Sequence, residues 1–172
     1  MKSTAKGTLA REMMSRPVRR LTARTPVRDA AEFLTRHGIS GAPVEDEHGR
    51  WLGVFSTTDL GRAVASRMSP PAVDRTLEAR EPVPPLPQQP SLESLGCVPV
   101  SDLMTAGLVT VFPDSTIDEV LRSMLHFKVH RVFVIDAESG ALEGVITTVD
   151  ILRWLEVSRD PSTAIRGARD SS

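Results

Sequence analysis

The stretch "GVFSTTDL" occupies residues 53–60, and "GVITTVDI" occupies residues 144–151. Both read Gly-Val, an apolar residue, Ser or Thr, two further residues, Asp and an apolar residue. Two interpretations are open: strand-to-helix turns resemble one another, or the chain is a tandem repeat with a site in each copy. The repeat is favoured because the agreement extends across a whole unit. The further aligned pairs are Met14-Ser15 with Met104-Thr105 and Val44-x-Asp46 with Val134-x-Asp136.

Composition is that of an ordinary soluble protein and argues against several functional classes. A net charge of -1, 4% aromatic residues and no tyrosine argue against nucleic-acid binding. No apolar run approaches the ~20 residues that span a bilayer, so we expect no membrane segment. The N-terminus lacks the apolar core of a secretory signal. Cys97 stands alone and cannot form an internal disulfide, which predicts a cytoplasmic protein.

The second repeat predicts three strands and two helices. Strands are expected at 108–111, 132–135 and 142–146, and a second helix from Thr147 or Thr148. Ser115 is a good N-cap for the first helix, and Thr116 with Glu119 is an alternative capping box. The first helix, "IDEVLRSMLHF", places Ile117, Val120, Leu121, Met124 and Leu125 on one stripe.

The first repeat follows the same order. A strand is expected around 19–22, a hairpin turn at His48-Gly49 and a second helix over 57–66. Thr25 is expected to cap the first helix, with Pro26 at its first position. Each repeat therefore reads β-α-β-β-α in an α/β (α+β) fold, preceded by a short helix ("LAREMM", "VSDLM").

These elements divide the chain into four parts. The repeats are expected at 8–66 and 99–157, with a proline-rich linker at 67–98 and a frayed tail at 158–172. Residues 69–99 hold eight of the thirteen prolines, which predicts extended chain with a helical turn at 74–79.

The chain resembles the tandem CBS (cystathionine β-synthase type) family, or Bateman module. The pieces that carry the resemblance are "EMMSRPV", "DLMTAGLVTV", "GISGAPVEDEHGRWLGVFSTTDL" and "KVHRVFVIDAESGALEGVITTVDI". The resemblance implies two repeats packed about a pseudo-twofold axis, with clefts that bind AMP, ATP or S-adenosylmethionine. It also implies a disc-like dimer of two modules.

The repeated phrase suits a ribose, whose neighbouring hydroxyls can both donate to one carboxylate. Asp59 and Asp150 fall in the first turn of a helix, three residues after Ser56 and Thr147. The structural alternative is that Ser56 and Thr147 are N-caps and the aspartates interact with the helix dipole. Because the phrase occurs twice in a chain that resembles the CBS family, the ligand interpretation is favoured.

The family implies that each cleft combines residues of both repeats, and "KVHRVFV" offers cations for phosphate. Ser56 and Asp59 would share one cleft with Leu108, Val109, Thr110, Val129, His130 and Arg131. Thr147 and Asp150 would share the other with Val18, Arg19, Arg20, Ile39 and Ser40. The Asp59 cleft is expected to bind a phosphorylated adenosine more tightly, because it includes His130 and Arg131.

Other candidates are weaker. His126 and His130 are four residues apart but lack a third ligand, so no metal is expected. Cys97 has no base nearby, and Trp51 and Trp154 are expected to pack.

The sequence thus predicts a non-catalytic module with no obligatory cofactor. An adenine nucleotide would be its regulatory ligand, and its output would pass to an unidentified partner protein. Apolar residues on the second helices, "LGRAVASRM" and "ILRWLEV", predict a homodimer. A ligand-free dimerisation scaffold is the alternative, and an enzyme is a distant third.

Overall fold

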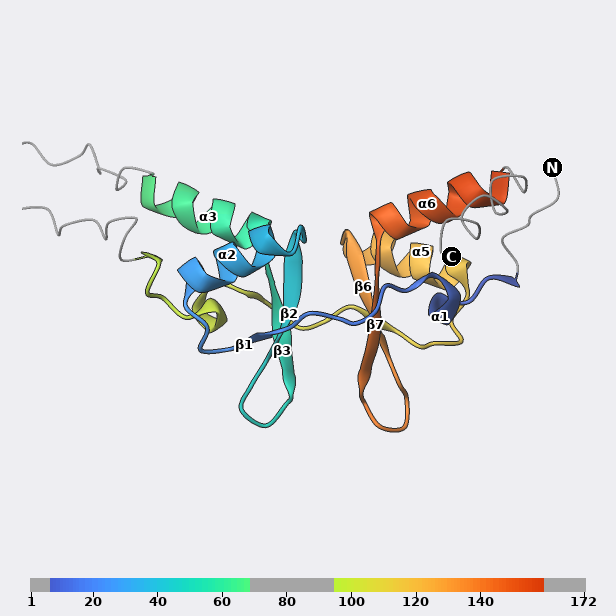
Figure 1. Ribbon diagram of the computed structural model, residues 1–172, viewed down its shortest axis with the longest axis horizontal. Coiled ribbons are helices and arrows are strands. Elements are labelled where there is room, and N and C mark those ends of the chain that lie inside the picture. Colours follow the sequence, from blue (N-terminus) through green and yellow to red (C-terminus); the bar gives the residue numbers. More distant parts are fainter. Residues whose placement is uncertain (1–6, 69–94, 160–172) are drawn as a thin grey trace, which may run out of the picture. The chain divides into compact units, whose positions relative to one another are not determined.

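The computed structural model describes residues 7–68 and 95–159, which form two compact units (Figure 1). Of these residues, 19–68 and 95–107 belong to one unit, here called the N-repeat unit. Residues 7–18 and 108–159 belong to the other, the C-repeat unit. Each unit contains one mixed sheet covered by helices, as the α/β prediction requires.

The N-repeat unit is built on a four-stranded sheet in the order β1-β2-β3-β4. β1 is parallel to β2, and the other pairs are antiparallel. The strands are β1 (Leu21–Thr22), β2 (Gly41–Glu45), β3 (Trp51–Ser56) and β4 (Thr105–Ala106), and the helices are α2 (Val27–Arg36), α3 (Thr57–Met68) and the 3-10 helix η2 (Val100–Asp102).

The C-repeat unit repeats this plan with a three-stranded sheet, β5-β6-β7. β5 is parallel to β6, and β6 is antiparallel to β7. The strands are β5 (Thr110–Val111), β6 (Arg131–Ile135) and β7 (Leu142–Thr147), and the helices are α1 (Ala10–Met13), α5 (Ile117–Phe127) and α6 (Thr148–Arg159).

Each unit has its own apolar core at equivalent positions. Val27 and Phe55 are buried in the N-repeat unit, and the equivalent residues Ile117 and Ile146 are buried in the C-repeat unit. The predicted stripe of α5 is confirmed at Ile117, Val120 and Met124. It is wrong at Leu125, which is 76% exposed because the apolar stripe of α5 is wider than the sheet that it covers.

The helix starts correct two predictions. Thr116, not Ser115, caps α5, in a capping box with Glu119. Pro26, not Thr25, is the N-cap position of α2, and no side chain caps that helix. Instead, the carbonyls of Val98 and Gly96 accept hydrogen bonds from the first free N–H groups of α2, at 2.8 and 3.2 Å.

Residues at the end of the predicted linker contact the N-repeat unit. Leu95 is only 5% exposed and lies in the core of the N-repeat unit, so structured chain precedes residue 99. At the other end, α3 continues to Met68 and α6 to Arg159. The helical turn predicted at 74–79 and most of the tail lie outside the described residues.

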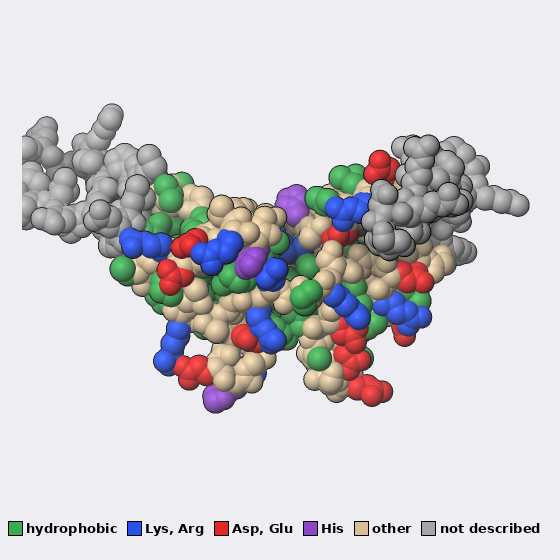
Figure 2. Space-filling view, in the orientation of Figure 1, with side chains coloured by type: hydrophobic (Ala, Val, Ile, Leu, Met, Phe, Trp, Pro, Cys, Tyr) green, Lys and Arg blue, Asp and Glu red, His purple; other side chains and the backbone are tan. Residues whose placement is uncertain are grey.

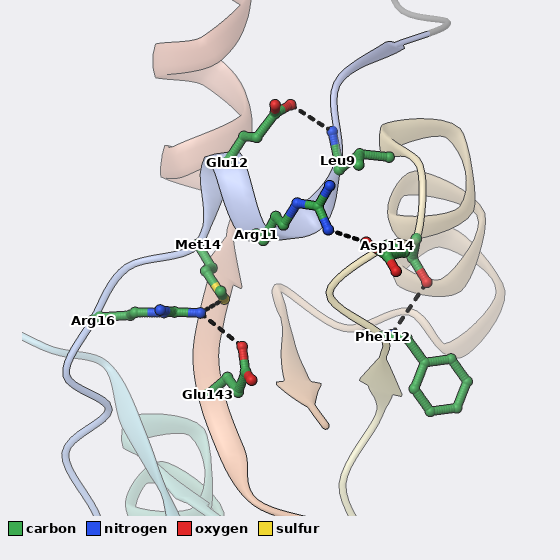
Figure 3. Close-up of polar contacts among 9 residues, drawn as sticks. Leu9, Arg11, Glu12, Met14, Arg16, Phe112, Asp114 and Glu143 are labelled. Carbon is green, nitrogen blue, oxygen red and sulfur yellow. Dashed lines mark hydrogen bonds and ion pairs between the residues drawn. The ribbon is translucent and has the colours of Figure 1, made fainter. Parts of the chain in front are cut away.

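The two leading segments, here residues 9–18 and 99–107, pack on the opposite repeat from the one they precede in sequence. The first lies in the C-repeat unit, where Ser15 bridges Val145 of β7. Arg11 pairs there with Asp114, and Arg16 with Glu143 at 2.7 Å (Figure 3). The second supplies η2 and β4 to the N-repeat unit. The segment that precedes each repeat in sequence thus belongs to the compact unit of the other repeat.

The crossing of the leading segments explains the glycine of the repeated phrase. A Cβ added at Gly53 would collide with the backbone of Thr105 and Ala106. A Cβ added at Gly144 would collide with the side chain of Met14. Only glycine lets the leading segment pass this close to the strand.

The aligned aspartates Asp46 and Asp136 organise the hairpin turns. Asp46 accepts hydrogen bonds from the N–H groups of Arg50 and His48, and Asp136 accepts from the hydroxyl and N–H of Ser139. The backbone bond from Arg50 is the main cause that lowers the pKa of Asp46, and the Ser139 side chain is the main cause for Asp136. The backbone N–H of Thr116 likewise lowers the pKa of Glu119.

We predict that Gly53→Ala destabilises the protein more than Gly144→Ala. Overpacking typically costs about 1–3 kcal/mol, and at Gly53 the obstacle is backbone, whereas the Met14 side chain can rotate away. Gly61→Ala, in an open position of α3, is the control and should stabilise by about 0.5–1 kcal/mol. Urea unfolding measures all three. Equal losses at Gly53 and Gly144 would contradict the close approach of the backbone.

We also predict that part of the stability is lost on acidification. A carboxylate whose folded pKa is lowered stabilises the fold above its unfolded pKa, and this contribution is lost as pH falls through the folded value. For Asp46 and Asp136 the window lies below about pH 4. The difference between the melting temperatures at pH 7 and pH 3 should therefore be smaller in Asp46→Asn than in the wild type. Glu138→Gln, in the exposed C-repeat turn, should leave the difference unchanged.

Candidate functional sites

Asp59 lies in the first turn of α3, directly after β3, and is 2% exposed. Its Oδ2 accepts hydrogen bonds from the backbone N–H and the hydroxyl of Ser56, at 2.8 and 2.6 Å. Oδ2 is thus held by the residue that ends β3, three positions earlier. This local pair corresponds to the helix-capping alternative that the sequence left open.

The other oxygen, Oδ1, is held from outside the turn. The Thr105 hydroxyl donates to it at 2.9 Å from the second leading segment. Arg62 of α3 donates at 3.1 Å. Because a buried carboxylate is costly without donors, this set of four bonds explains how Asp59 is accommodated.

Asp150 has the same environment in the C-repeat unit, with looser contacts. Thr147 provides both bonds to Oδ2, at 2.8 and 2.6 Å, and the Asp150 N–H donates back to the Thr147 hydroxyl at 3.3 Å. Ser15 of the first leading segment donates to Oδ1 at 3.1 Å, and Arg153 lies 3.5 Å away. The side chain of Asp150 is 9% exposed.

Strand entries lie beside these carboxylate turns. The carbonyl of Ser40 accepts from Thr57 N–H at the start of α3, and the carbonyl of His130 accepts from Thr148 N–H at the start of α6. Arg131 is the register partner of Thr147. Each carboxylate therefore adjoins the second-strand entry of its own repeat.

The remaining predicted residues are divided between the units. Arg20 pairs with Glu45 at 3.1 Å, and Val109 accepts a backbone bond from Phe133. Burial, followed by the charges of Arg19 and Arg36, lowers the pKa of His37, so Arg19 lies near the end of α2. The N-repeat unit contains Arg19, Arg20, Ile39, Ser40, Ser56 and Asp59, and the C-repeat unit contains Val18, Leu108, Val109, Thr110, Val129, His130, Arg131, Thr147 and Asp150.

The two predicted clefts combine residues of different compact units, and they stay predictions. What each unit brings together by itself is a hydroxyl-bearing residue, a carboxylate and the entry of a strand. Four partners of the carboxylates were missed: Ser15, Thr105, Arg62 and Arg153. Their signal was repetition, because Ser15 aligns with Thr105, and an arginine follows each aspartate by three residues.

Other features offer less. Within residues 7–68 and 95–159, no cluster of three or more His, Cys, Asp or Glu side chains is arranged for a metal. The described helices include none long and apolar enough to cross a bilayer. Cys97 is an exposed free thiol. Trp154 is half-buried and donates to the Thr8 hydroxyl at 3.3 Å, so it packs as expected.

Charge is mixed over the surface. Figure 2 shows acidic and basic side chains interspersed on the face drawn. An open depression of about 440 Å³ at the N-repeat hairpin contains the pairs Arg24–Glu47 and Arg50–Asp46. It includes none of the predicted ligand residues.

Comparison with known proteins identifies the family. The CBS domain model matches residues 10–66 and 100–157, which include both carboxylate turns. The chain belongs to the CBS domain family. Its two matches agree with the two copies inferred from the repeated phrase.

Individual relatives place this module in larger proteins. The chain is 31% identical, over 79% of its length, to the chloroplastic CBS domain-containing protein CBSX2 of Arabidopsis thaliana. It is 24% identical, over 85% of its length, to an L-aspartate semialdehyde sulfurtransferase of Methanocaldococcus jannaschii. The chain spans 58% and 23% of the lengths of these relatives.

Solved structures share the fold. The CBS domain pair of protein MJ0100, in complex with 5′-methylthioadenosine and S-adenosyl-L-methionine, matches with a TM-score of 0.66 at 22% identity, over 88% of this chain and 98% of that one. CBSX2 in complex with AMP matches with a TM-score of 0.63 at 22% identity, over 90% of this chain and all of that one.

Proposed function

We propose that this chain is a regulatory module that binds an adenosine-type ligand through Asp59 and Asp150. The carrying observation is the duplicated carboxylate turn, in which Oδ2 is fixed by Ser56 or Thr147 and Oδ1 is bonded to side chains. A ribose diol offers donors that can replace those side chains. Family membership supports the proposal, as do the adenosine compounds in the complexes of MJ0100 and CBSX2.

The proposal extends to the remaining predicted ligand residues. His130 and Arg131 would hold a phosphate, Arg being able to donate two parallel bonds to it. The ligand would bind one arrangement of the chain better than another and so shift their populations. The output would act on a partner protein in the cytoplasm, without catalysis by this chain.

The ligand itself provides the sharpest test of the ribose contact. We expect AMP to bind the wild-type protein about 10- to 150-fold more tightly than 2′,3′-dideoxy-AMP, because a charge-assisted hydrogen bond contributes roughly 1.5–3 kcal/mol. Isothermal calorimetry measures both without altering the protein. Equal affinities for AMP and 2′,3′-dideoxy-AMP would show that the carboxylates do not contact the ribose hydroxyls.

Adenosine serves as the matched control for the phosphate. Arg131→Gln should weaken AMP and leave adenosine nearly unchanged. If no adenosine compound, S-adenosylmethionine included, binds at millimolar concentration, the ligand-free dimerisation scaffold replaces the nucleotide sensor.

We also propose that the protein is a homodimer that uses the C-repeat helices. The motive is an apolar surface on α5 and α6, where Leu125 is 76% and Leu152 59% exposed. The equivalent N-repeat positions are Thr35 and Gly61. The expected apolar excess is therefore confirmed on α6, whereas α3 exposes no large apolar side chain among its described residues. The other exposed large apolar residues of these helices are Phe127, Val149, Leu155 and Val157.

Replacing Leu125 and Leu152 by Gln should convert a dimer into a monomer in light scattering at micromolar concentration. Both side chains are exposed, so the melting temperature at high dilution should change little. Thr35→Gln with Gly61→Gln, at the equivalent N-repeat positions, is the control and should leave the dimer intact. A wild-type mass of one 18.7 kDa chain would contradict the proposal.

A further inference from the structure

We propose that Ser15 and Thr105 are latches that compete with the ligand for Oδ1 of Asp150 and Asp59. This inference rests on the proposed function. Both residues belong to leading segments, which reach the carboxylate from a distant part of the sequence. A ligand hydroxyl that takes Oδ1 must displace the latch hydroxyl, and ligand binding is thereby coupled to the leading segment.

The two carboxylate oxygens have different hydrogen-bond partners, and this difference supports the assignment. Oδ2 is bonded within its own turn by Ser56 or Thr147, through both backbone and hydroxyl, at the same distances of 2.8 and 2.6 Å in both units. Oδ1 accepts only from side chains, which can turn away without breaking the fold. Oδ1 is therefore the exchangeable oxygen, and Oδ2 keeps the carboxylate oriented during the exchange.

The latch residues themselves are exposed, although the carboxylates are buried. Ser15 and Thr105 both lie on the surface of their units, whereas Asp59 is 2% exposed. Rotation of one exposed hydroxyl side chain would uncover Oδ1. The arginines on the other side, Arg62 and Arg153, are also largely exposed, at 65% and 68%, and can follow.

The two latches differ in strength. Thr105 is 2.9 Å from Oδ1 and Arg62 is 3.1 Å away, whereas the C-repeat contacts are 3.1 Å from Ser15 and 3.5 Å from Arg153. The Asp150 side chain is also the more exposed of the two, at 9%. Oδ1 of Asp150 is thus the easier to free, and we expect a ligand without a phosphate to occupy the Asp150 turn first.

Release of a latch has a consequence for the backbone. Ser15 also exchanges backbone hydrogen bonds with Val145 of β7, at 2.9 and 3.2 Å. These are the only described backbone bonds between the first leading segment and β7. Losing the side-chain bond removes one attachment of this short bridge, so ligand binding should loosen residues 9–15.

The test combines calorimetry with hydrogen exchange on the full chain, using AMP and 5′-methylthioadenosine as probes. For 5′-methylthioadenosine, which has no phosphate, Ser15→Ala should tighten the higher-affinity binding step by about tenfold, and Thr105→Val should tighten the lower-affinity step by at least as much, since each removes a competing bond to a charged group. Ser101→Ala removes a hydroxyl that bonds Asp102 instead, and should change neither step. In the wild type, AMP should speed amide exchange at Ser15 and Val145.

The outcomes separate the latch from the proposed function. If AMP binds but Ser15→Ala and Thr105→Val leave both affinities unchanged, the latch is overturned and the nucleotide site stands. If Thr105→Val alone tightens the first step of 5′-methylthioadenosine binding, the order of occupancy is reversed and the strength argument fails. If neither probe binds the wild type or any variant, the proposed function itself fails. Binding by the variants alone would support both.

Discussion

Each compact unit depends on one buried carboxylate that joins three parts of the chain. Asp59 connects the end of β3, the first turn of α3 and the second leading segment, and Asp150 does the same in the C-repeat unit. A carboxylate so far removed from water needs several donors, and each aspartate finds them in Ser or Thr, arginine and backbone. The donors within the turn, the N–H and hydroxyl of Ser56 or Thr147, hold the carboxylate in place. The geometry of the turn from β3 to α3, and of the turn from β7 to α6, is therefore set by these polar contacts as well as by the apolar core of each unit.

This constraint also accounts for the residue types in the repeated phrase. Glycine is required where the leading segment crosses the strand, Ser or Thr where the strand ends, and Asp where the helix begins. Fold alone would thus preserve the phrase in both copies, and its repetition by itself does not establish a ligand. What favours a ligand is the unequal use of the two oxygens. A purely structural cap needs Oδ2, whereas Oδ1 is bonded to exposed side chains that lie outside the cap.

Local patterns predicted what local interactions determine. The hairpin turns at Gly49 and Gly140, the α5 capping box and the strands all follow from residues close in sequence. The cap of α2 and the placement of the leading segments were not predicted because both depend on contacts with distant parts of the chain. Pro26 needs no side-chain cap because Val98 and Gly96 accept from α2, and the leading segments changed places because their strand partners cannot be read from their own residues. For the site, Ser56, Asp59, Thr147 and Asp150 were found through their spacing. Thr105 and Ser15 were aligned but not connected to the aspartates, which lie 46 and 135 residues away.

The two repeats share a fold, but they carry different residues at some equivalent positions. α2 is followed by Gly38 in the left-handed conformation, where glycine is unstrained, whereas α5 ends with Lys128 at φ 53°. A side chain in this conformation costs about 1 kcal/mol, so Lys128 stands there against local backbone preference. It lies two residues before His130 and three before Arg131, at the strand entry where the C-repeat concentrates positive charge. Basic residues at that entry favour a phosphate, whereas the looser latch at Asp150 favours the ribose hydroxyls. Because these two preferences are assigned to different carboxylates by the family arrangement, the affinities for adenosine and AMP need not rank the two sites in the same order.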